Sequence, residues 1–567
     1  MRMKKILIAG MITAACFVFA ACAPTVGGDN GGNDTAETVE LTFDCGDGAF
    51  RDGKNGVTVV ADKNGKVELD DSPVRDGYAF AGWYCGDERF DSDKTYTAAQ
   101  TFTATYVSGA EDSVYDALFD AGSTVKLDID MSDAEWKKLD RDYWNFIGGK
   151  SPIYRMADSV TVGITTADGT LEYYYEEVGV RMKGNTSRRS FYNDDGFYDS
   201  VHFKLSFTQT FDDGDEYSPD EIKVWESKDE RKARKNRTLG KMEKVDIKWN
   251  STADDSHVRD IYAMKLFRDN GIIAPDSTLC AVAAKEKDKS FRNLGVYKLF
   301  EAVDEVFLAR AMPDDADGDL YKCSWGSNKP ADFTDADGTV GVEDELNGKF
   351  YTYDKKTNKK VVDGNGNRDF SKLTDFISAL GVGSASDYVD LIDVDYFAKF
   401  EALNYIIGNP DCIRNNANNF YIYFRGDGKA IFIPYDYDRC LGITKDWDPH
   451  NANTDLTPYT RQTAARGNQT NPLYIKLIDK GAPCGEGSVL MKYRERLIAF
   501  ASSDAIKESA FDAYKIGYKN KYAAFSATCT LPNNTKFDAG NTVNMPYSEY
   551  MGKKLKTLND NIDNYRA

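Results

Sequence analysis

The sequence predicts an α+β protein in which a small β module precedes a larger mixed domain. Residues 39–107 alternate apolar and polar side chains between Gly/Asp turns, a pattern typical of strands. From residue 112 onward, strand-like runs are interspersed with runs whose apolar residues recur at helical spacing. A length of 567 residues with 41% hydrophobic residues is enough for two or more domains with a sizeable core.

The N-terminus predicts export and lipid anchoring. Residues 1–21 combine a basic start with an apolar core too short for a stable membrane span, as in a signal peptide. The small residues before Cys22 resemble a bacterial lipobox, which makes Cys22 the expected lipidated residue. Cleavage of a simple signal peptide nearby is the alternative. Residues 22–38 are rich in Gly, Asn, Asp and Thr and predict a flexible tether. We therefore expect a membrane-anchored lipoprotein on the cell surface or facing the extracytoplasmic space.

Composition excludes some classes of function. A formal net charge of −20 argues against nucleic acid as a partner and is compatible with a basic protein substrate. With only 3 histidines, a zinc site or a His-dependent triad is hard to build. Of 10 cysteines, Cys16 lies in the signal peptide and Cys22 is the predicted lipid site, so eight remain for possible disulfides. Cys45 and Cys85 occupy neighbouring positions of the β pattern and could form one.

The β module resembles a known repeat of bacterial surface proteins. The stretch GYAFAGWY at 77–84 and the closing TATY at 103–106 are similar to the internalin-type B repeat, a small β-grasp domain. The aromatic residues of the module are interpreted as its core and not as a ligand site: Phe43, Phe80, Trp83 and Tyr106. Such a module would space or present the domain that follows.

The larger domain should contain both kinds of regular element in alternation. Strands are predicted at 124–129, 159–165, 171–180, 201–207, 278–284, 294–300, 419–424 and 430–434. Helices are predicted at 112–120, 132–142, 255–270, 371–380, 384–408, 471–479, 487–501 and 547–565.

The stretch 405–442 gathers the polar residues that best indicate a site. A Gly-Asn-Pro break ends a helix just before Asp411, and a hairpin with a Gly-Asp-Gly turn then leads to Asp436 and Asp438. Because a hairpin returns its two ends to one place, Asp411, Asn419 and Asp436 should converge. Hard oxygen ligands without histidine or thiol suit Mg²⁺ or Mn²⁺. An Asx-rich surface loop that caps a helix explains the spacing equally well.

The stretch GNPDCIRNNANNFYIYFRGDGKAIFIPYDYDRCLG at 408–442 resembles the signature of the spore-coat CotH kinase family of atypical secreted protein kinases. Further blocks agree with it in family order: GVRMKGNTSR (179–188), HFKLSF (202–207), HVRDIYAMKLFRDNGIIAP (257–275), GVYKLFEAVD (295–304), GDLYK (318–322) and YDKKTNKK (353–360). The resemblance implies a bilobal protein-kinase-like domain over residues 112–567. It also implies metal-dependent transfer of the ATP γ-phosphoryl group to Ser or Thr of a surface or secreted protein.

The same resemblance assigns roles to individual residues. Asp411 would orient or deprotonate the acceptor hydroxyl. Asp436 and Asn419 would hold the metal, with Asp438 assisting and Asn416, at the spacing of ordinary kinases, competing for the role. The expected nucleotide-binding residues are Lys204, Arg181 and Arg188 at the phosphates, and Tyr297 and Glu301 beside the adenine.

Some of these assignments have competing interpretations. The basic Gly-bearing loop 183–189 could be a solvated turn, and Lys204 could be a strand lysine that reaches to solvent. The chain also departs from the family pattern: the 411–419 loop is long, and Ala430 stands where many relatives have Trp, which should weaken an adenine contact.

Two other classes of function compete with a kinase. The first is a catalytically inactive kinase-like scaffold that acts as a surface binding or adhesion lipoprotein. The second is a calcium-dependent adhesin built on the acidic loops 314–319 and 335–345, although neither loop completes a twelve-residue calcium motif. The basic run 228–237 could be a solvated helix face or an insertion near the substrate.

Overall fold

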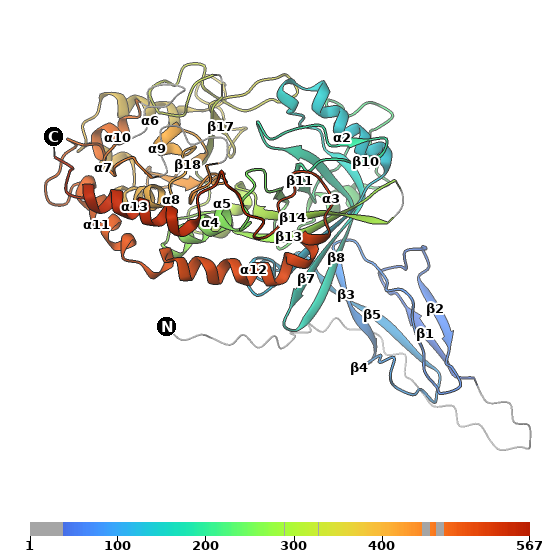
Figure 1. The fold of residues 1–567 in the computed structure, drawn as a ribbon. Coiled ribbons are helices and arrows are strands. Elements are labelled where there is room, and N and C mark those ends of the chain that lie inside the picture. The colour runs from blue at the N-terminus through green and yellow to red at the C-terminus, as the bar shows by residue number, and fades with distance from the viewer. Residues whose placement is uncertain (1–37, 288–289, 327, 445–453, 461–469, 567) are drawn as a thin grey trace, which may run out of the picture.

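The structure, a computed structural model, describes residues 38–287, 290–326, 328–444, 454–460 and 470–566. The predicted signal peptide and nearly all of the tether lie outside these residues. The described chain is α+β, as the sequence predicts, with a large sheet on one side and a smaller sheet wrapped by helices on the other (Figure 1). No helix in the described ranges is both long and apolar enough to span a membrane.

Seven strands of the larger domain close into a ring. Their order is β11-β12-β14-β13-β6-β7-β8, and β11 also pairs with β8, which joins the two ends. The strands are β6 (Thr124–Asp130), β7 (Arg155–Thr166), β8 (Gly169–Lys183), β11 (His202–Ser206), β12 (Lys244–Lys248), β13 (Ser277–Lys285) and β14 (Phe291–Glu301). One apolar cluster fills the inner face, including Val162, Val180, Phe203, Ile247 and Leu299, so polar residues that alternate with these face outward.

The β module continues this sheet. Its strands are β1 (Glu40–Asp44), β2 (Gly56–Val60), β3 (Tyr78–Cys85), β4 (Glu88–Arg89) and β5 (Gln100–Ser108). β1 pairs parallel with β5 and antiparallel with β2, around a core that includes Phe43, Trp83 and Phe102. β3 pairs antiparallel with β8 through Tyr78 and Ala79 (Figure 1). The module has its own core but shares backbone hydrogen bonds with the ring, and the domain boundary at residue 107 stays a prediction.

The basic run lies at the junction of module and ring. Its helix is α3 (Lys228–Lys235), capped by Ser227. Arg234 pairs with Glu177 of β8 at 2.8 Å, and Arg237 pairs with Asp76 of the module at 2.6 Å. Arg237 also donates to the carbonyl of Glu176 on β8, so it joins the module to the ring.

The second body combines a five-stranded sheet, ordered β16-β17-β15-β18-β19, with most of the helices. Its strands are β15 (Asp319–Cys323), β16 (Val340–Gly341), β17 (Tyr353–Lys355), β18 (Phe420–Phe424) and β19 (Ala430–Pro434). Its helices are α5 (Glu305–Ala311), α6 (Ser371–Val382), α7 (Tyr388–Leu391), α8 (Val394–Ile407), α9 (Ile413–Asn416), α10 (Pro472–Leu477), α11 (Val489–Ala501) and α13 (Tyr547–Asn561). The predicted helix 384–408 is divided in two, because Asp393 caps a new helix through its side chain.

Helices pack both inside and outside the ring: the first two of those that remain add side chains such as Leu118 and Trp136 to the inner cluster, and the last two cover the outer face of β13 and β14. The remaining helices are α1 (Asp112–Phe119), α2 (Asp133–Asn145), α4 (Arg259–Asp269) and α12 (Glu508–Thr528). Helix α12, which is absent from the predicted helices, packs against β13 and β14 (Figure 1). Within the described residues no disulfide joins Cys45 to Cys85.

Candidate functional site

The predicted polar cluster assembles around Asp411. Helix α8 ends at Gly408, whose left-handed backbone (φ 64°) turns the chain into the loop that carries Asp411. Oδ1 of Asp411 accepts hydrogen bonds from the amides of Asn416 at 2.6 Å and Asn418 at 3.0 Å. Oδ2 accepts one from Asn419 at 3.0 Å. Burial raises the pKa of Asp411, and the amide hydrogen bonds act in the opposite direction.

A fully buried ion pair stabilises this loop. Arg414 in the short helix α9 pairs with Glu401 of α8, and both side chains are at most 2% exposed. Its other guanidinium nitrogen, Nη2, donates to the carbonyl oxygens of Pro458 at 2.8 Å and Thr460 at 3.0 Å. Tyr474 donates its hydroxyl to Glu401 at 2.7 Å. The loop is therefore fixed by charge-assisted contacts to two other segments.

Asp436 meets a lysine that the sequence analysis did not single out. Oδ1 of Asp436 lies 2.5 Å from Nζ of Lys248 on β12, which also lies 3.4 Å from Asp260 at the start of α4. Burial opposes ionisation of Asp436, but the charges of Lys248 and Lys183 outweigh it and hold the pKa below its usual range. The Asp436 side chain is 34% exposed and can reach a ligand.

The pKa of the neighbouring carboxyl group, Asp438, is shifted in the opposite direction. Burial, followed by the charge of Asp436, raises the pKa of Asp438 to about 7. Two carboxyl groups that push their pKa values apart within one small site are a common feature of functional centres.

A polar face of the ring supplies further cations. In register across β8, β11 and β12 lie Arg181, Lys204 and Asp246. Asp246 pairs with Lys183 and lies 3.5 Å from Lys204. The predicted phosphate lysine, Lys204, is thus on the expected face but beside Asp246, whereas Lys248 is the lysine that contacts Asp436. The sequence signal for Lys248 is the strict alternation of polar and apolar residues in KVDIK at 244–248, which places its side chain on the polar face of a strand.

Arg181 and Arg188 carry donor atoms that are not satisfied. Arg181 pairs through Nη1 with Glu345 at 2.8 Å, but its Nε is buried without a hydrogen-bond partner. Nε and Nη1 of Arg188 are also buried without one, and burial lowers the pKa of Arg188 to about 10. Buried guanidinium donors usually have partners, so this pattern favours an anionic ligand.

The side chains expected beside the adenine point elsewhere. Tyr297 is 2% exposed inside the ring and stacks on Phe203. Glu301 accepts hydrogen bonds from Tyr115 at 2.9 Å and from Nε of Arg310 at 2.8 Å. Ala430 is buried in the core of the second body, where its side chain faces no open space. The structure does not bring these three side chains to the site.

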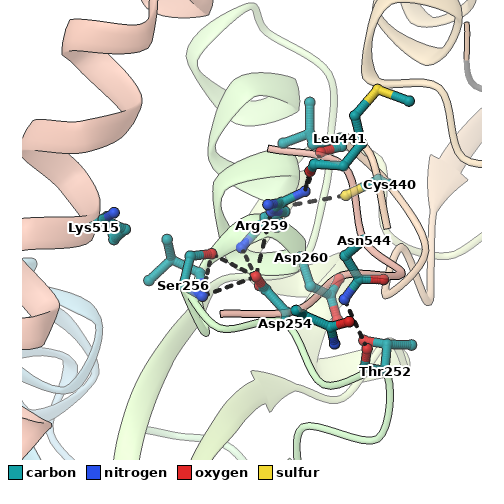
Figure 2. A network of polar contacts seen from close by, with 12 residues as sticks. Thr252, Asp254, Ser256, Arg259, Asp260, Cys440, Leu441, Lys515 and Asn544 are labelled. Atoms are coloured by element: carbon teal, nitrogen blue, oxygen red, sulfur yellow. Dashed lines mark hydrogen bonds and ion pairs between the residues drawn. The ribbon is translucent and has the colours of Figure 1, made fainter. Parts of the chain in front are cut away.

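A network at the start of α4 connects the site to the C-terminal part of the chain. Figure 2 shows Arg259 between Asp254 and the backbone of Leu441, and the guanidinium also donates to the carbonyl of Met545 at 2.7 Å. Asp254 in turn accepts from Ser256 at 2.7 Å. This network occupies residues expected to be helical, so α4 begins at Arg259 and not at residue 255. It fixes the chain three residues after Asp438.

The donor set fits a hard divalent cation. Within the described residues no three His, Cys, Asp or Glu side chains are grouped for a metal, so any ion would need amide ligands as well. Nδ2 of Asn416 donates a hydrogen bond to Asp411, and the buried Oδ1 of Asn416 has no hydrogen-bond partner. Together with Asp436 and Asp438 this gives oxygen donors of the kind that Mg²⁺ and Mn²⁺ prefer. Asn419 likewise uses its Nδ2 on Asp411.

A kinase-type phosphotransfer centre contains a lysine paired with a helix carboxylate, an aspartate after a strand, and a loop aspartate close to an asparagine. Lys248 with Asp260, then Asp436, and then Asp411 correspond to these parts. A comparison with protein families agrees with this class. The family model described as CotH kinase protein matches residues 206–483, a range that contains Lys248, Asp411 and Asp436. The match supports the CotH family for this part of the chain and suggests an atypical kinase. No curated protein matches the chain.

Proposed function

We propose that this protein is an atypical protein kinase that transfers the ATP γ-phosphoryl group to Ser or Thr of a surface or secreted protein. The observation that carries the proposal is the contact between Lys248, Asp436 and Asp260, next to an Asp411 whose two oxygens are held by three asparagine amides. If the segment were only a solvated Asx-rich loop, a buried contact with a lysine from the other sheet would not be expected.

In this proposal the phosphates lie against the cationic face of the ring. Lys248 and Lys183 contact the phosphate oxygens, and Arg188 donates its free guanidinium hydrogens to them. Asp436, Asp438 and Asn416, with Asn419 as the alternative amide, would hold Mg²⁺ or Mn²⁺, which neutralises phosphate charge when bound.

Asp411 acts on the acceptor. Its carboxylate accepts the proton of the Ser or Thr hydroxyl as that oxygen bonds to the γ-phosphorus, and the bond to the bridging oxygen breaks to release ADP. The amides of Asn416, Asn418 and Asn419 fix the orientation of the carboxylate, so that its position does not depend on the substrate.

The N-terminal sequence supports a proposal for where the protein acts. We propose that Cys22 is lipidated and that the tether and the β module, which resembles a B repeat, hold the catalytic domain away from the membrane. Substrates would then be proteins of the same surface or secreted ones, and the source of ATP would be extracytoplasmic.

The test uses the mature chain without residues 1–21. Calorimetry with ATP and Mg²⁺ or Mn²⁺ should show metal-dependent binding, and labelled ATP should transfer label to a basic carrier protein. Binding without transfer to any acceptor, including the protein itself, would favour the inactive scaffold. Absence of both would refute the proposal.

A further inference from the structure

A group of cations adjoins the site on the side of the second body. Five cationic side chains interact with the carboxylate of Glu343 or Glu345: Lys150, Arg181, Arg188, Lys322 and Lys356. We call these the cationic cluster. Nζ of Lys322 lies 5.0 Å from the ring of Tyr435, the residue before Asp436, so the cluster reaches the metal-binding residues.

Glu345 occupies this cluster as an internal anion. Its Oε2 accepts from Nη1 of Arg181 at 2.8 Å, and its side chain is 12% exposed. It comes from the segment between β16 and β17, whereas Arg181 lies on β8 of the ring. The ion pair therefore joins the two bodies across the site.

The carboxylates do not saturate the cluster. Asp354 pairs with Lys356, and Asp246 and Glu216 also interact with cations of the cluster. Even so, Nε of Arg181 and two nitrogens of Arg188 are buried without a hydrogen-bond partner. A triphosphate carries more negative charge and more acceptor oxygens than one carboxylate, and guanidinium groups bind phosphate in a bidentate manner. The cluster is better matched to phosphate than to the glutamate that is there.

We propose that Glu345 occupies the place beside Arg181 and Arg188 where the terminal phosphates of the nucleotide would bind, and that the phosphates displace it. The inference rests on the proposed nucleotide binding for its biological meaning. Its consequence is that Glu345 competes with the nucleotide, and that displacement breaks a contact between the ring and the second body.

The test measures affinity for inorganic tripolyphosphate by calorimetry, with the full mature chain at fixed salt. Glu345→Gln removes the charge and keeps the size, and we expect about tenfold tighter binding, equivalent to about 1.4 kcal/mol. The matched control is Asp344→Asn, since Asp344 is an adjacent carboxylate that hydrogen-bonds only within its own turn, to Asn347. The control should bind as the wild type does. In an Arg181→Gln background, Glu345→Gln should have a smaller effect, because only the interaction of Glu345 with the remaining cations is then removed.

A second measurement does not depend on any variant. Hydrogen exchange of residues 343–350 in the wild type should accelerate when tripolyphosphate is added. Equal or weaker binding by Glu345→Gln, or no binding by either protein, would overturn the inference and show that Glu345 only orients Arg181. ATP affinity of the wild type is measured in parallel. If the wild type binds ATP but Glu345→Gln does not bind tripolyphosphate more tightly, the proposed function stands and the inference about Glu345 fails. If Glu345→Gln binds tripolyphosphate more tightly but the wild type does not bind ATP, the inference about Glu345 stands and the proposed function fails.

Discussion

Replacing Lys248 tests its structural role and its proposed catalytic role separately. Lys248→Met removes the partner of Asp260, which is 1% exposed, and of Asp436. Losing one member of a buried ion pair costs about 3–5 kcal/mol, because the other charge stays buried. Lys298 lies 3.9 Å from Asp260 and compensates in part, so we expect about 3 kcal/mol less free energy of unfolding.

A double variant supplies the control. Lys248→Met combined with Asp260→Asn removes the uncompensated charge, so most of the stability should return in urea unfolding. ATP binding and phosphoryl transfer should not return, because the phosphate contact is still missing, and we expect at least a roughly 100-fold lower kcat/KM. Wild-type ATP affinity in Lys248→Met, or recovery of activity in the double variant, would refute the reasoning.

Four further predictions concern separate parts of the molecule. Asp436→Ala should abolish metal-dependent ATP binding, whereas Asp411→Asn should leave binding nearly intact and remove turnover; identical behaviour of the two would contradict the division of roles. Cys22→Ser should release the protein from membranes into the aqueous phase on detergent partitioning. Deletion of residues 40–107 should lower stability, since β8 loses a neighbour, yet keep the nucleotide-dependent thermal shift. Burial lowers the pKa of His257 to about 4, so its contribution to stability is fully present above pH 6.5 and is lost as the pH falls toward 4. His257→Asn should therefore reduce the change in unfolding free energy over this pH range by up to about 3 kcal/mol.

Local sequence patterns were sufficient for the hairpin at the site. The turn residues and the apolar runs predicted β18 and β19 within one residue, and the Gly-Asn-Pro break placed Asp411 on its loop. Convergence of Asp411 with Asn419 followed from hairpin geometry and is present. These features depend on residues close together in the chain, so a single sequence carries enough information about them.

Contacts between distant segments were not predictable in the same way. Lys248 and Asp436 are 188 residues apart, and Arg181 and Glu345 are 164 apart, so no local pattern indicates either pair. Lys204 was chosen because its strand belongs to a recognisable block, yet strand register decides which lysine reaches the site. Helix α12 was missed although Phe511, Tyr518 and Tyr522 are buried at helical spacing, because tyrosine-rich segments also favour strands.

The pairing of β3 with β8 has a mechanical consequence for an anchored protein. Force on the N-terminal anchor would run through the tether and β module before it reaches the junction, where Tyr78 and Ala79 pair with Tyr174 and Tyr173. β8 continues from there for ten residues to Lys183, about 33 Å at the usual rise of a strand. A shear load would therefore act along the strand that ends beside Asp246, and pulling on the anchor would strain the end of the ring where we propose that the phosphates bind.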